Sequence, residues 1–567
     1  MEIEGVKGVI VVKADSFDYG THLQNVLALT PSVAITPDNF FNSYKTIQPQ
    51  NYYTIMKALF SRFLMIATII GVFTACSSEK ENYLSSIPAE SSMVIKVNAT
   101  QLVNKSNILN NPLVGGLLMQ AEQSVPDALK AKFEEIKNNP EASGVDLQKP
   151  LAIALDLGNL DITSAAGVPN VSVVGVLPIK DIKKFEELLN SVSEVESTFT
   201  ISETEGVKRI NIPEEEFSVA YNSSRLVMAY GKGTNAVSLV SQQEKESMLA
   251  HPDFAEFAAN DKDASLFMDY EWMMNLVAEA QKNMGAPASV SPQLMEYLKG
   301  MNVYGTLNFE TGKVVGDMKV YLDESARKYM ETFYLKPSGK LVGLIPADSY
   351  LGFNFAVKNY SECLKFLGEE VRQQIEELLA QYGLSEELID NVHGDILLAM
   401  YQGTDNPLIP NFVVAAQCKD RTLFDKVKEL MQITTEGDMF DLPNQGYRVS
   451  FVDNVLIVST KGLYNQCLAS GSIKAWDKSW KGTPMGDALS KGGIAIDFQA
   501  ISKNPLLQEM ADNRDGAMTL SILKQLETLS MQMESMQETT TELSLTNKNK
   551  NALEQLIAIG IGAAMAR

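Results

Sequence analysis

The chain contains an internal repeat, and this repeat limits the possible folds more than any other feature. Ile87-Pro88-Ala89-Glu90-Ser91 returns as Ile345-Pro346-Ala347-Asp348-Ser349, and each copy introduces a strand-like run. PNVSVVGVLPIKD at 169–181 returns as PNFVVAAQCKD at 410–420, and apolar residues at helical spacing follow each. The repeated unit is too long for a solenoid, so each copy is a domain or half of one two-lobed body.

The connections between the strands predict the type of sheet. FSVAYNSSRLVMAY at 217–230 and YRVSFVDNVLIVST at 447–460 both indicate hairpins. Asp181 and Asp420 stand where each following helix needs an N-cap. Hairpins, alternating faces and single flanking helices predict an α+β fold, with two related tandem lobes. Each lobe is expected to be a mainly antiparallel sheet with helices packed on one side.

The stretch MKALFSRFLMIATIIGVFTACSSEKEN, at residues 56–82, has the features of an export signal. A basic start precedes the eleven-residue run Phe63–Phe73, in which Thr68 is the one polar residue. A membrane-spanning helix needs about 20 apolar residues, so this run is too short to span comfortably. Phe73-Thr74-Ala75-Cys76 is similar to the bacterial lipobox, in which a peptidase cuts before a cysteine that carries a diacylglycerol. A retained membrane anchor is the alternative.

These features divide the chain into parts. We interpret residues 1–55 as translated upstream sequence and Met56 as the start; the alternative is a cytoplasmic extension before a retained anchor. The second repeat begins after Leu335-Lys336-Pro337-Ser338-Gly339, where Pro and Gly interrupt the pattern. The predicted parts are a signal peptide at 56–75, a tether at 76–86, a first repeat at 87–338 and a second repeat at 339–567.

Charge and cysteine content limit the partners and the chemistry. The net charge of −22 argues against binding to nucleic acid and against adsorption to anionic lipid through a basic face. If Cys76 carries a lipid, Cys363, Cys418 and Cys467 remain, which permits at most one disulfide. Cys418 matches either Leu177 or Ile179 of the first repeat, so we expect a buried thiol there.

No pattern in the sequence predicts catalysis. Beyond residue 75 there are two histidines, His251 and His393, and neither has a second histidine at the spacing of a zinc site. Asp512-Asn513-Arg514-Asp515-Gly516 has Arg514 where a calcium loop needs a ligand, so it predicts a turn. Asp156 and Asp161 could serve a glycosidase, or they could be solvated loop acids. We therefore expect no catalytic residue, no metal and no cofactor.

Two further groups of residues are candidates for binding. Trp476 and Trp480 in AWDKSWKGTP are four residues apart, so one helical turn would place them on one face for contact with a sugar ring or a partner surface. The alternative is that both pack a helix onto the sheet. Met531 and Met533 alternate along a strand, which favours a buried strand face over a soft-metal site.

With these motifs, the sequence resembles an uncharacterised two-repeat family of Bacteroidota lipoproteins, known as a domain of unknown function. The resemblance covers residues 56–567 and is carried by Phe73-Thr74-Ala75-Cys76 and by Ile87-Pro88-Ala89. It implies lipidation of Cys76 and a location in the cell envelope, but no activity. Ser78-Glu79-Lys80-Glu81 is an interrupted version of the acidic signal that follows the cysteine in surface lipoproteins of that phylum.

These observations predict an outer-membrane lipoprotein that is not an enzyme. We expect a binding or scaffolding component that faces the periplasm or the cell surface and contacts a protein or a glycan. The alternatives are a hydrolase that acts on envelope glycan and a purely structural protein.

Overall fold

The computed structural model describes most of both repeats. The described residues are 82–110, 125–156, 171–195, 200–211, 217–231, 234–283, 292–366, 369–381, 383, 385–401, 411–434, 436–442, 446–460 and 479–566. The upstream segment, the predicted signal peptide and Cys76 lie outside these residues.

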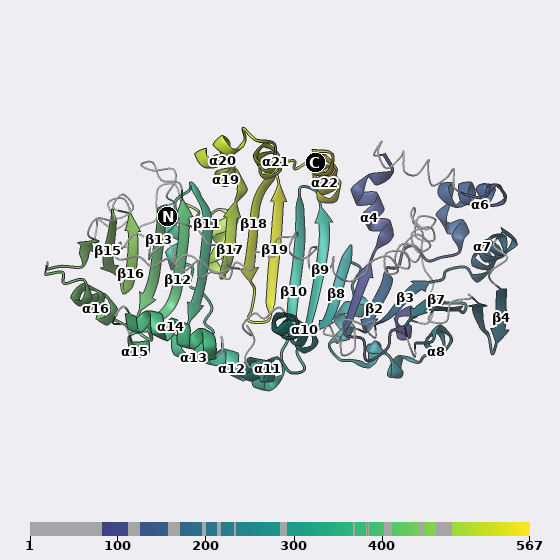
Figure 1. Cartoon of the computed structure of the whole chain (residues 1–567), viewed down its shortest axis with the longest axis horizontal. Coiled ribbons are helices and arrows are strands. Elements are labelled where there is room, and N and C mark those ends of the chain that lie inside the picture. Colours follow the sequence, from purple (N-terminus) through teal and green to yellow (C-terminus); the bar gives the residue numbers. More distant parts are fainter. Residues whose placement is uncertain are drawn as a thin grey trace, which may run out of the picture. The chain divides into compact units, whose positions relative to one another are not determined.

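One sheet of 19 strands runs through both repeats, and Figure 1 shows its strands side by side. Every pairing between neighbouring strands is antiparallel. The first repeat contributes, in spatial order, β4 (Thr200–Thr204), β5 (Val207–Asn211), β6 (Phe217–Tyr221), β7 (Arg225–Tyr230), β3 (Ser172–Pro178), β2 (Leu151–Asp156), β1 (Met93–Val97), β8 (Ala264–Asp269), β9 (Asn302–Glu310) and β10 (Lys313–Tyr321). The second repeat continues with β19 (Glu538–Leu545), β18 (Leu526–Met533), β17 (Gly493–Asp497), β11 (Ser349–Val357), β12 (Val392–Tyr401), β13 (Asn411–Cys418), β16 (Val455–Thr460), β15 (Tyr447–Val452) and β14 (Met439–Asp441).

The two repeats use the same strand order and meet at a seam between β10 and β19. Counted outward from the seam, each strand from β10 to β5 has its counterpart in the series from β19 to β14. The Ile179 N–H donates to the carbonyl oxygen of Ser224, and the Cys418 N–H donates to the carbonyl oxygen of Asn454. Ser224 and Asn454 stand at the same place in matching hairpins, so Cys418 is the counterpart of Ile179. The sheet is continuous across the seam and does not divide into two separate lobes.

The helices and 3-10 turns pack on both faces of this sheet. The sequence pattern predicts helices on one face only, so that part of the prediction is wrong. In the first repeat they are η2 (Tyr83–Ser86), α4 (Ala99–Ser106), η3 (Ile108–Asn110), α6 (Asp127–Asn138), η4 (Pro140–Ser143), α7 (Ile182–Val195), α8 (Ala236–Val240), η5 (Glu244–Glu246), η6 (Met248–Ala250), α9 (Phe254–Ala259), α10 (Tyr270–Asn283), α11 (Pro292–Leu298) and α12 (Glu324–Phe333). In the second repeat they are η7 (Lys340–Leu344), α13 (Tyr360–Phe366), α14 (Glu369–Gln381), α15 (Glu386–Ile389), α16 (Thr422–Leu430), α18 (Pro484–Ser490), α19 (Phe498–Ser502), α20 (Pro505–Met510), α21 (Arg514–Leu523) and α22 (Ala552–Ala566). The α+β class is confirmed, and none of the helices in the described residues is both long and apolar enough to cross a membrane.

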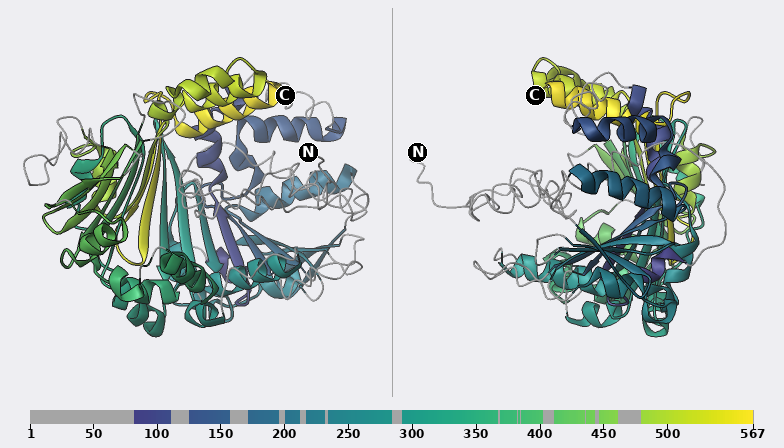
Figure 2. Two further views of the ribbon diagram at one scale, coloured as in Figure 1. Left: turned by 60° about the vertical axis from the view of Figure 1, so that its left-hand side comes forward. Right: turned by 90° about the vertical axis from the view of Figure 1, so that its right-hand side faces the viewer.

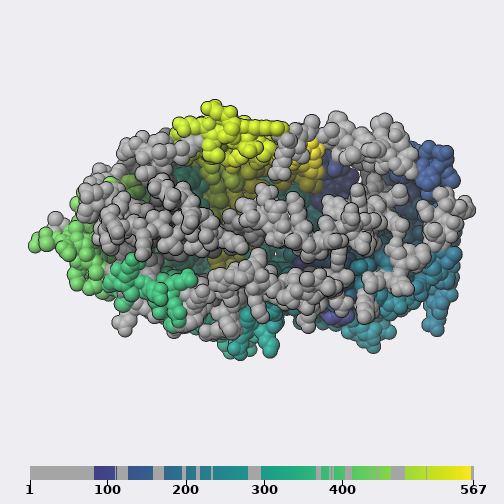
Figure 3. Space-filling model, in the orientation of Figure 1, coloured from purple at the N-terminus to yellow at the C-terminus, as the bar shows by residue number. Residues whose placement is uncertain are grey.

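Helices stand at both ends of the strands. Figure 1 and the left panel of Figure 2 show α19–α22 at one end and α10–α14 at the other. In the space-filling view of Figure 3, the yellow-green helices from α19 to α21 lie along the upper edge of the viewed face. The middle of the strands therefore lies between two sets of helices.

Local signals in the sequence explain how these elements begin and turn. Asp453 and Asn454 both have positive φ, as the two central residues of a type I′ hairpin turn require. Oδ1 of Asp181 accepts from the Lys183 N–H, which confirms the predicted cap of α7. The N-cap of α16 is Arg421, so the predicted cap at Asp420 is wrong by one residue, although its Oδ1 still accepts from the Thr422 N–H. Asp269 and its counterpart Asp497 cap the helices that follow β8 and β17 in the same way.

Candidate ligand-binding face

The described strands present one apolar face that crosses the seam. Residues directly opposite one another in an antiparallel pair have their side chains on the same face, so the strand register defines a row. We define the apolar face as this central row together with the parallel row that lies two residues further along each strand of the seam. The central row is Leu307, Gly316, Thr541, Met531, Ile494, Phe353, Leu398, Val414 and Val458. The parallel row at the seam is Gly305, Met318, Thr539 and Met533.

The large side chains of the apolar face at the seam remain partly exposed to solvent. Leu307 is 37% exposed, Met318 44% and Met531 36%. In the central row, Ile494, Phe353 and Leu398 are only partly buried. Helices pack at its two ends: α22 contacts Phe309 and Leu543, while α15 and α16 contact residues next to Phe355. The described helices therefore cover the ends of the strands more completely than their middle.

The other face of the seam is mainly polar, because polar and apolar residues alternate along these strands. Along β10, the residues Lys313, Asp317 and Lys319 alternate with Val314, Gly316, Met318 and Val320. The Thr540 hydroxyl donates to Asp317 across the seam at 2.9 Å. The polar face is suited to water, whereas the apolar face gains free energy when another apolar surface covers it.

Two ion pairs lie on the polar face, and one of them crosses the seam. The Lys313 ammonium lies 2.8 Å from the Glu542 carboxylate, and this hydrogen bond holds the pKa of Lys313 above its usual value. The Lys319 ammonium lies 2.6 Å from Glu256, and the same kind of bond lowers the pKa of Glu256. The first pair joins β10 to β19, and the second joins β10 to α9 of the same repeat. All four side chains are partly exposed, so neither pair contributes much to stability.

The prediction that Trp480 is an exposed binding residue is wrong, because its side chain is buried. Its side chain is 1% exposed and packs with Leu341, Leu489 and Ala495 in the core of the second repeat. Ser479 forms an isolated bridge with Pro346, so Trp480 does not lie in a helical turn. Trp480 is therefore a core residue, and Trp476 lies outside the described residues.

Met531 and Met533 alternate with the polar residues of β18 as predicted, but the prediction that Met531 is buried is wrong. A strand pattern shows which side chains share a face. It does not show whether another element covers that face, and at Met531 the cover is incomplete. The apolar face was missed for this reason. The available signal was that VVGDMKV and TTTELSL each keep one face free of charge, which marks both strands of the seam.

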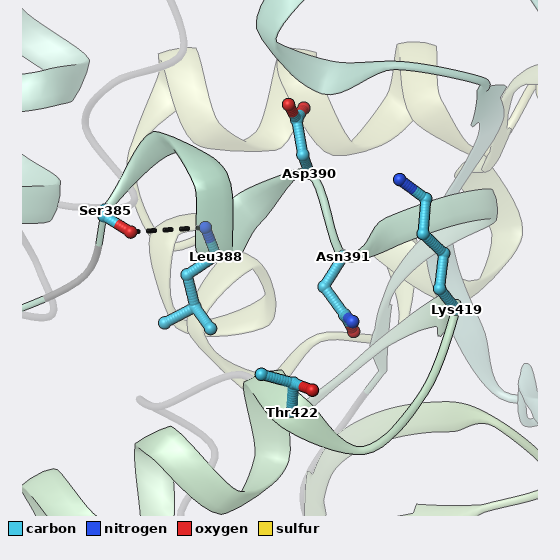
Figure 4. A pocket seen from close by; sticks show the side chains of 6 residues that line it. All are labelled: Ser385, Leu388, Asp390, Asn391, Lys419 and Thr422. Atoms are coloured by element: carbon cyan, nitrogen blue, oxygen red, sulfur yellow. Dashed lines mark hydrogen bonds between the residues drawn. The ribbon is translucent and has the colours of Figure 1, made fainter.

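A polar pocket of about 340 Å³ lies beside the start of α16, and Figure 4 shows its lining. The lining residues are Ser385, Leu388, Asp390, Asn391, Lys419 and Thr422. Its polar groups hold loops: Asp390 accepts from the Ser361 N–H, and the Asn391 amide donates to Asp420. Hydrogen bonds from Thr422 and Asn391 keep the pKa of Asp420 below its usual value. The pocket thus belongs to the N-terminal cap of α16.

The corresponding place in the first repeat holds an ion pair. Lys180, the counterpart of Lys419, lies 3.1 Å from Glu141 of η4. Among the described residues, Lys419 makes no ion pair within 4 Å. The pairing of this lysine is therefore a local difference between the repeats.

A second pocket, of about 210 Å³, brings Glu90 and Asp156 to one cavity. The remaining lining is made mostly of hydroxyl, amide and small apolar side chains from β2, β3, α8 and the segments next to them. Asp161, which the sequence pairs with Asp156 in a possible glycosidase, lies outside the described residues. The structure thus places one predicted acid in a cavity with another acid that the sequence did not single out.

The other candidates have structural positions. His393 is exposed, and its Nδ1 lies 2.9 Å from the carbonyl oxygen of Lys358. Asn513 caps α21, so the segment from Asp512 to Gly516 is a helix start. Cys418 is a buried free thiol whose pKa burial raises to about 11, and Cys363 is also free. The described residues contain no group of three or more His, Cys, Asp or Glu that could hold a metal ion.

A family model described as a domain of unknown function, DUF4836, matches residues 83–553. The chain belongs to this family. The match begins at η2 and ends in α22, so the DUF4836 domain includes both repeats and the seam between them. A search of curated proteins finds no match.

Solved structures of the protein TP0453 give weak matches to part of this chain. Crystal form I is 10% identical, with a TM-score of 0.24, over 43% of this chain and 80% of that one. Crystal form III is 9% identical, with a TM-score of 0.24, over 45% and 90% of the two chains. Crystal form IV is 10% identical, with a TM-score of 0.24, over 45% and 86%.

Proposed function

We propose that this DUF4836 protein is a lipid-anchored component of the outer membrane that binds an apolar ligand without catalysing a reaction. The observation that carries the proposal is the apolar face, with Leu307, Met318 and Met531 partly exposed at the seam. Large exposed apolar patches on folded proteins mark binding sites or interaction surfaces. The binding surface spans both repeats, which gives a reason for keeping the two copies in one chain.

The apolar face is tested by placing a charge on it. We expect Met531→Lys to weaken the binding of N-phenyl-1-naphthylamine, a neutral dye that fluoresces in apolar surroundings, by about tenfold or more, because an ammonium is costly to bury against hydrocarbon. Fluorescence titration of the purified protein measures the Kd. Circular dichroism checks that the fold is retained.

Ser530→Lys is the matched control. Ser530 is next to Met531 on β18, but its side chain lies on the polar face, opposite Glu542. A lysine there keeps the charge change and leaves the apolar face intact, so dye binding should stay at the wild-type value. Equal loss of binding in both variants, or in neither, would contradict the proposed surface.

The lipid anchor is proposed from the lipobox-like sequence and is tested at Cys76. Cells supplied with an alkyne analogue of palmitate should label the wild-type protein, whereas Cys76→Ser should remain unlabelled. Cys467→Ser should keep the label, because Cys467 has no lipobox around it. Label that persists in Cys76→Ser would show that the lipid is attached to another residue. An unlabelled Cys76→Ser protein that still fractionates with the membrane would point to a retained helix at residues 56–75. Protease treatment of intact cells then decides whether the protein faces the periplasm or the cell surface.

The pocket of Glu90 and Asp156 is the observation that favours the alternative, a hydrolase of envelope glycan. Two carboxylates that share a cavity could act as acid and base on a glycosidic bond. Release of soluble sugar from envelope polysaccharide by the wild-type protein, but not by Asp156→Asn, would support the hydrolase.

A further inference from the structure

We infer that the edge strand β14 binds an extended segment of another polypeptide, which adds to the sheet as a further antiparallel strand. This site lies at the end of the second repeat and is separate from the apolar face, so the inference does not depend on the proposed function. The first repeat carries the argument, because a strand of the chain itself covers the corresponding edge there.

β4 has no counterpart among the described strands of the second repeat. Counted from the seam, β5 is the counterpart of β14, and β4 lies one strand beyond β5. Among the described residues, β14 pairs with β15 alone, so the position that β4 fills in the first repeat is open in the second. The first repeat thus shows which kind of element covers this edge, an extended strand.

The residues of β5 and β14 can be matched through the strands that they pair with. Ala220 of β6 and Ser450 of β15 are counterparts, because the hairpins that follow them match. Arg209 is opposite Ala220, and Met439 is opposite Ser450. Arg209 and Met439 are therefore counterparts, and both side chains are exposed.

Two residues of β14 turn their backbone groups away from β15. The carbonyl oxygen of Asp438 accepts from β15, and the N–H of Leu442 donates to β15. Hydrogen-bonded positions alternate along an antiparallel strand, so the N–H and C=O groups of Met439 and Asp441 point to the open side. Such a row of outward N–H and C=O groups is a template for an added strand.

The first repeat uses the corresponding groups to bind β4. The two-residue turn between β4 and β5 has positive φ at both positions, so the pair that closes it is hydrogen-bonded, as is every second pair beyond it. These pairs include Ser202 with Arg209 and Thr200 with Asn211. An added strand in the same register would bond to Met439 as Ser202 bonds to Arg209.

The buried side of β14 favours an apolar residue in the added strand. Phe440 is 5% exposed, and its ring packs against Phe424 of α16 with centroids 5.6 Å apart. In the first repeat, Ile201 of β4 is opposite Ile210, the counterpart of Phe440. An apolar residue opposite Phe440 would extend this cluster in the same way.

The charges of β14 and its neighbours do not protect the edge. Asp438 is paired with Arg421, and the Asp441 carboxylate lies 2.7 Å from Arg448. Lone charges, lysine above all, are what discourage pairing at natural edges, and these two acids are neutralised.

The sign of the charge at Asp438 also selects the segment. Its counterpart in β5 is Lys208, which is opposite Glu203 of β4 and lies 3.8 Å from that carboxylate. The sign is reversed in the second repeat, so the matching residue of the bound segment is basic, and an acid there would be repelled.

The test is a titration of the full chain carrying Cys76→Ser, so that no lipid anchor contributes, with a fluorescein-labelled peptide. The peptide has the sequence of residues 198–206 with Glu203→Lys, and fluorescence anisotropy measures its Kd. N-methylation at positions 200 and 202 removes the two N–H groups that should face β14, so we expect binding to weaken about tenfold or more. N-methylation at positions 201 and 203 removes two N–H groups that face away, and the Kd should not change.

A pair of variants at Met439 tests the same bonds from the protein. Met439→Pro removes the outward N–H but takes no hydrogen bond from β15, as proline on the outer side of an edge strand allows. We expect it to abolish peptide binding. Met439→Thr keeps the N–H and suits a strand, so it should bind as the wild type does. Circular dichroism checks the fold of both variants.

Each other outcome would overturn the inference. If the peptide does not bind, or if both methylated peptides bind equally well, β14 does not add a strand. Weakening by methylation at positions 201 and 203 alone would show that the register of β4 does not apply. A mass in light scattering that rises with protein concentration, and does not rise in Met439→Pro, would assign the edge to a second copy of the chain.

Discussion

Arg225→Met is expected to lower the free energy of unfolding by about 3–5 kcal/mol, because it removes several charge-assisted hydrogen bonds from the core. The Arg225 side chain is 2% exposed. Its Nε and Nη2 donate to the carbonyl oxygen of Val240 at 3.0 and 2.7 Å, and its Nη1 donates to the carbonyl oxygen of Asn82 at 3.0 Å and to Ser85 Oγ. Methionine keeps an apolar stem but removes the guanidinium donors, which leaves the Val240 carbonyl oxygen with one long bond from the Asn222 amide and the Asn82 carbonyl oxygen with the Ser85 N–H.

Urea unfolding followed by circular dichroism measures the loss, and two positions supply controls. Arg209 is exposed on β5, so Arg209→Met should change stability by no more than about 0.5 kcal/mol. Val455, the counterpart of Arg225 in the second repeat, is buried and apolar, which shows that this strand position accepts a hydrocarbon side chain. Limited proteolysis should also find residues 82–86 cut faster in Arg225→Met. An unchanged urea midpoint together with unchanged cleavage would show that Arg225 does not hold this segment.

Trp480→Ala should destabilise the second repeat by a similar amount, about 3–5 kcal/mol. The indole ring fills the space between β11 and α18: a Cβ placed on Gly352 would lie 2.7 Å from both Trp480 and Leu489. Alanine would leave a cavity that the surrounding strands cannot close. The midpoint of urea unfolding measures the change.

Trp480→Phe separates packing from hydrogen bonding at this position. The Trp480 Nε1 is buried and has no hydrogen-bond partner. Phenylalanine keeps most of the packing and removes that unsatisfied donor, so its cost should be well below that of alanine. Trp480→Ala at wild-type stability, together with weakened capture of a glycan or protein, would instead restore Trp480 as an exposed contact.

Much of the fold could be predicted from the sequence because the repeat shows each element twice. Asp181 predicts a helix start, and the Asp453-Asn454 turn predicts a hairpin; both are confirmed. Asp420 predicts a helix cap one residue before the observed one. The pairing of β10 with β19 could not be predicted, because it joins residues far apart in the sequence and depends on no local turn. For the same reason, local patterns could not show whether the sheet is continuous.

The candidate site was harder to predict than the fold. Met531 has the spacing of a core residue, yet its side chain is 36% exposed. Trp480 lies in a segment whose composition is typical of a surface contact, yet its side chain is 1% exposed. Exposure depends on what other parts of the chain place over a side chain, and residue type reports it only on average. The apolar face became visible only when the register of several strands was known.

The seam also affects how the chain folds. Asp317 pairs with Thr540, about 220 residues later in the sequence, so β10 is synthesised long before its partner. Until β19 arrives, β10 is an open edge that could pair with another chain. Lys313, Asp317 and Lys319 on its polar side are the kind of charged residues that discourage such pairing. Closing this long loop is entropically slow, so joining the repeats is expected to be a late step in folding, and the charges on β10 protect the chain from aggregation in the meantime.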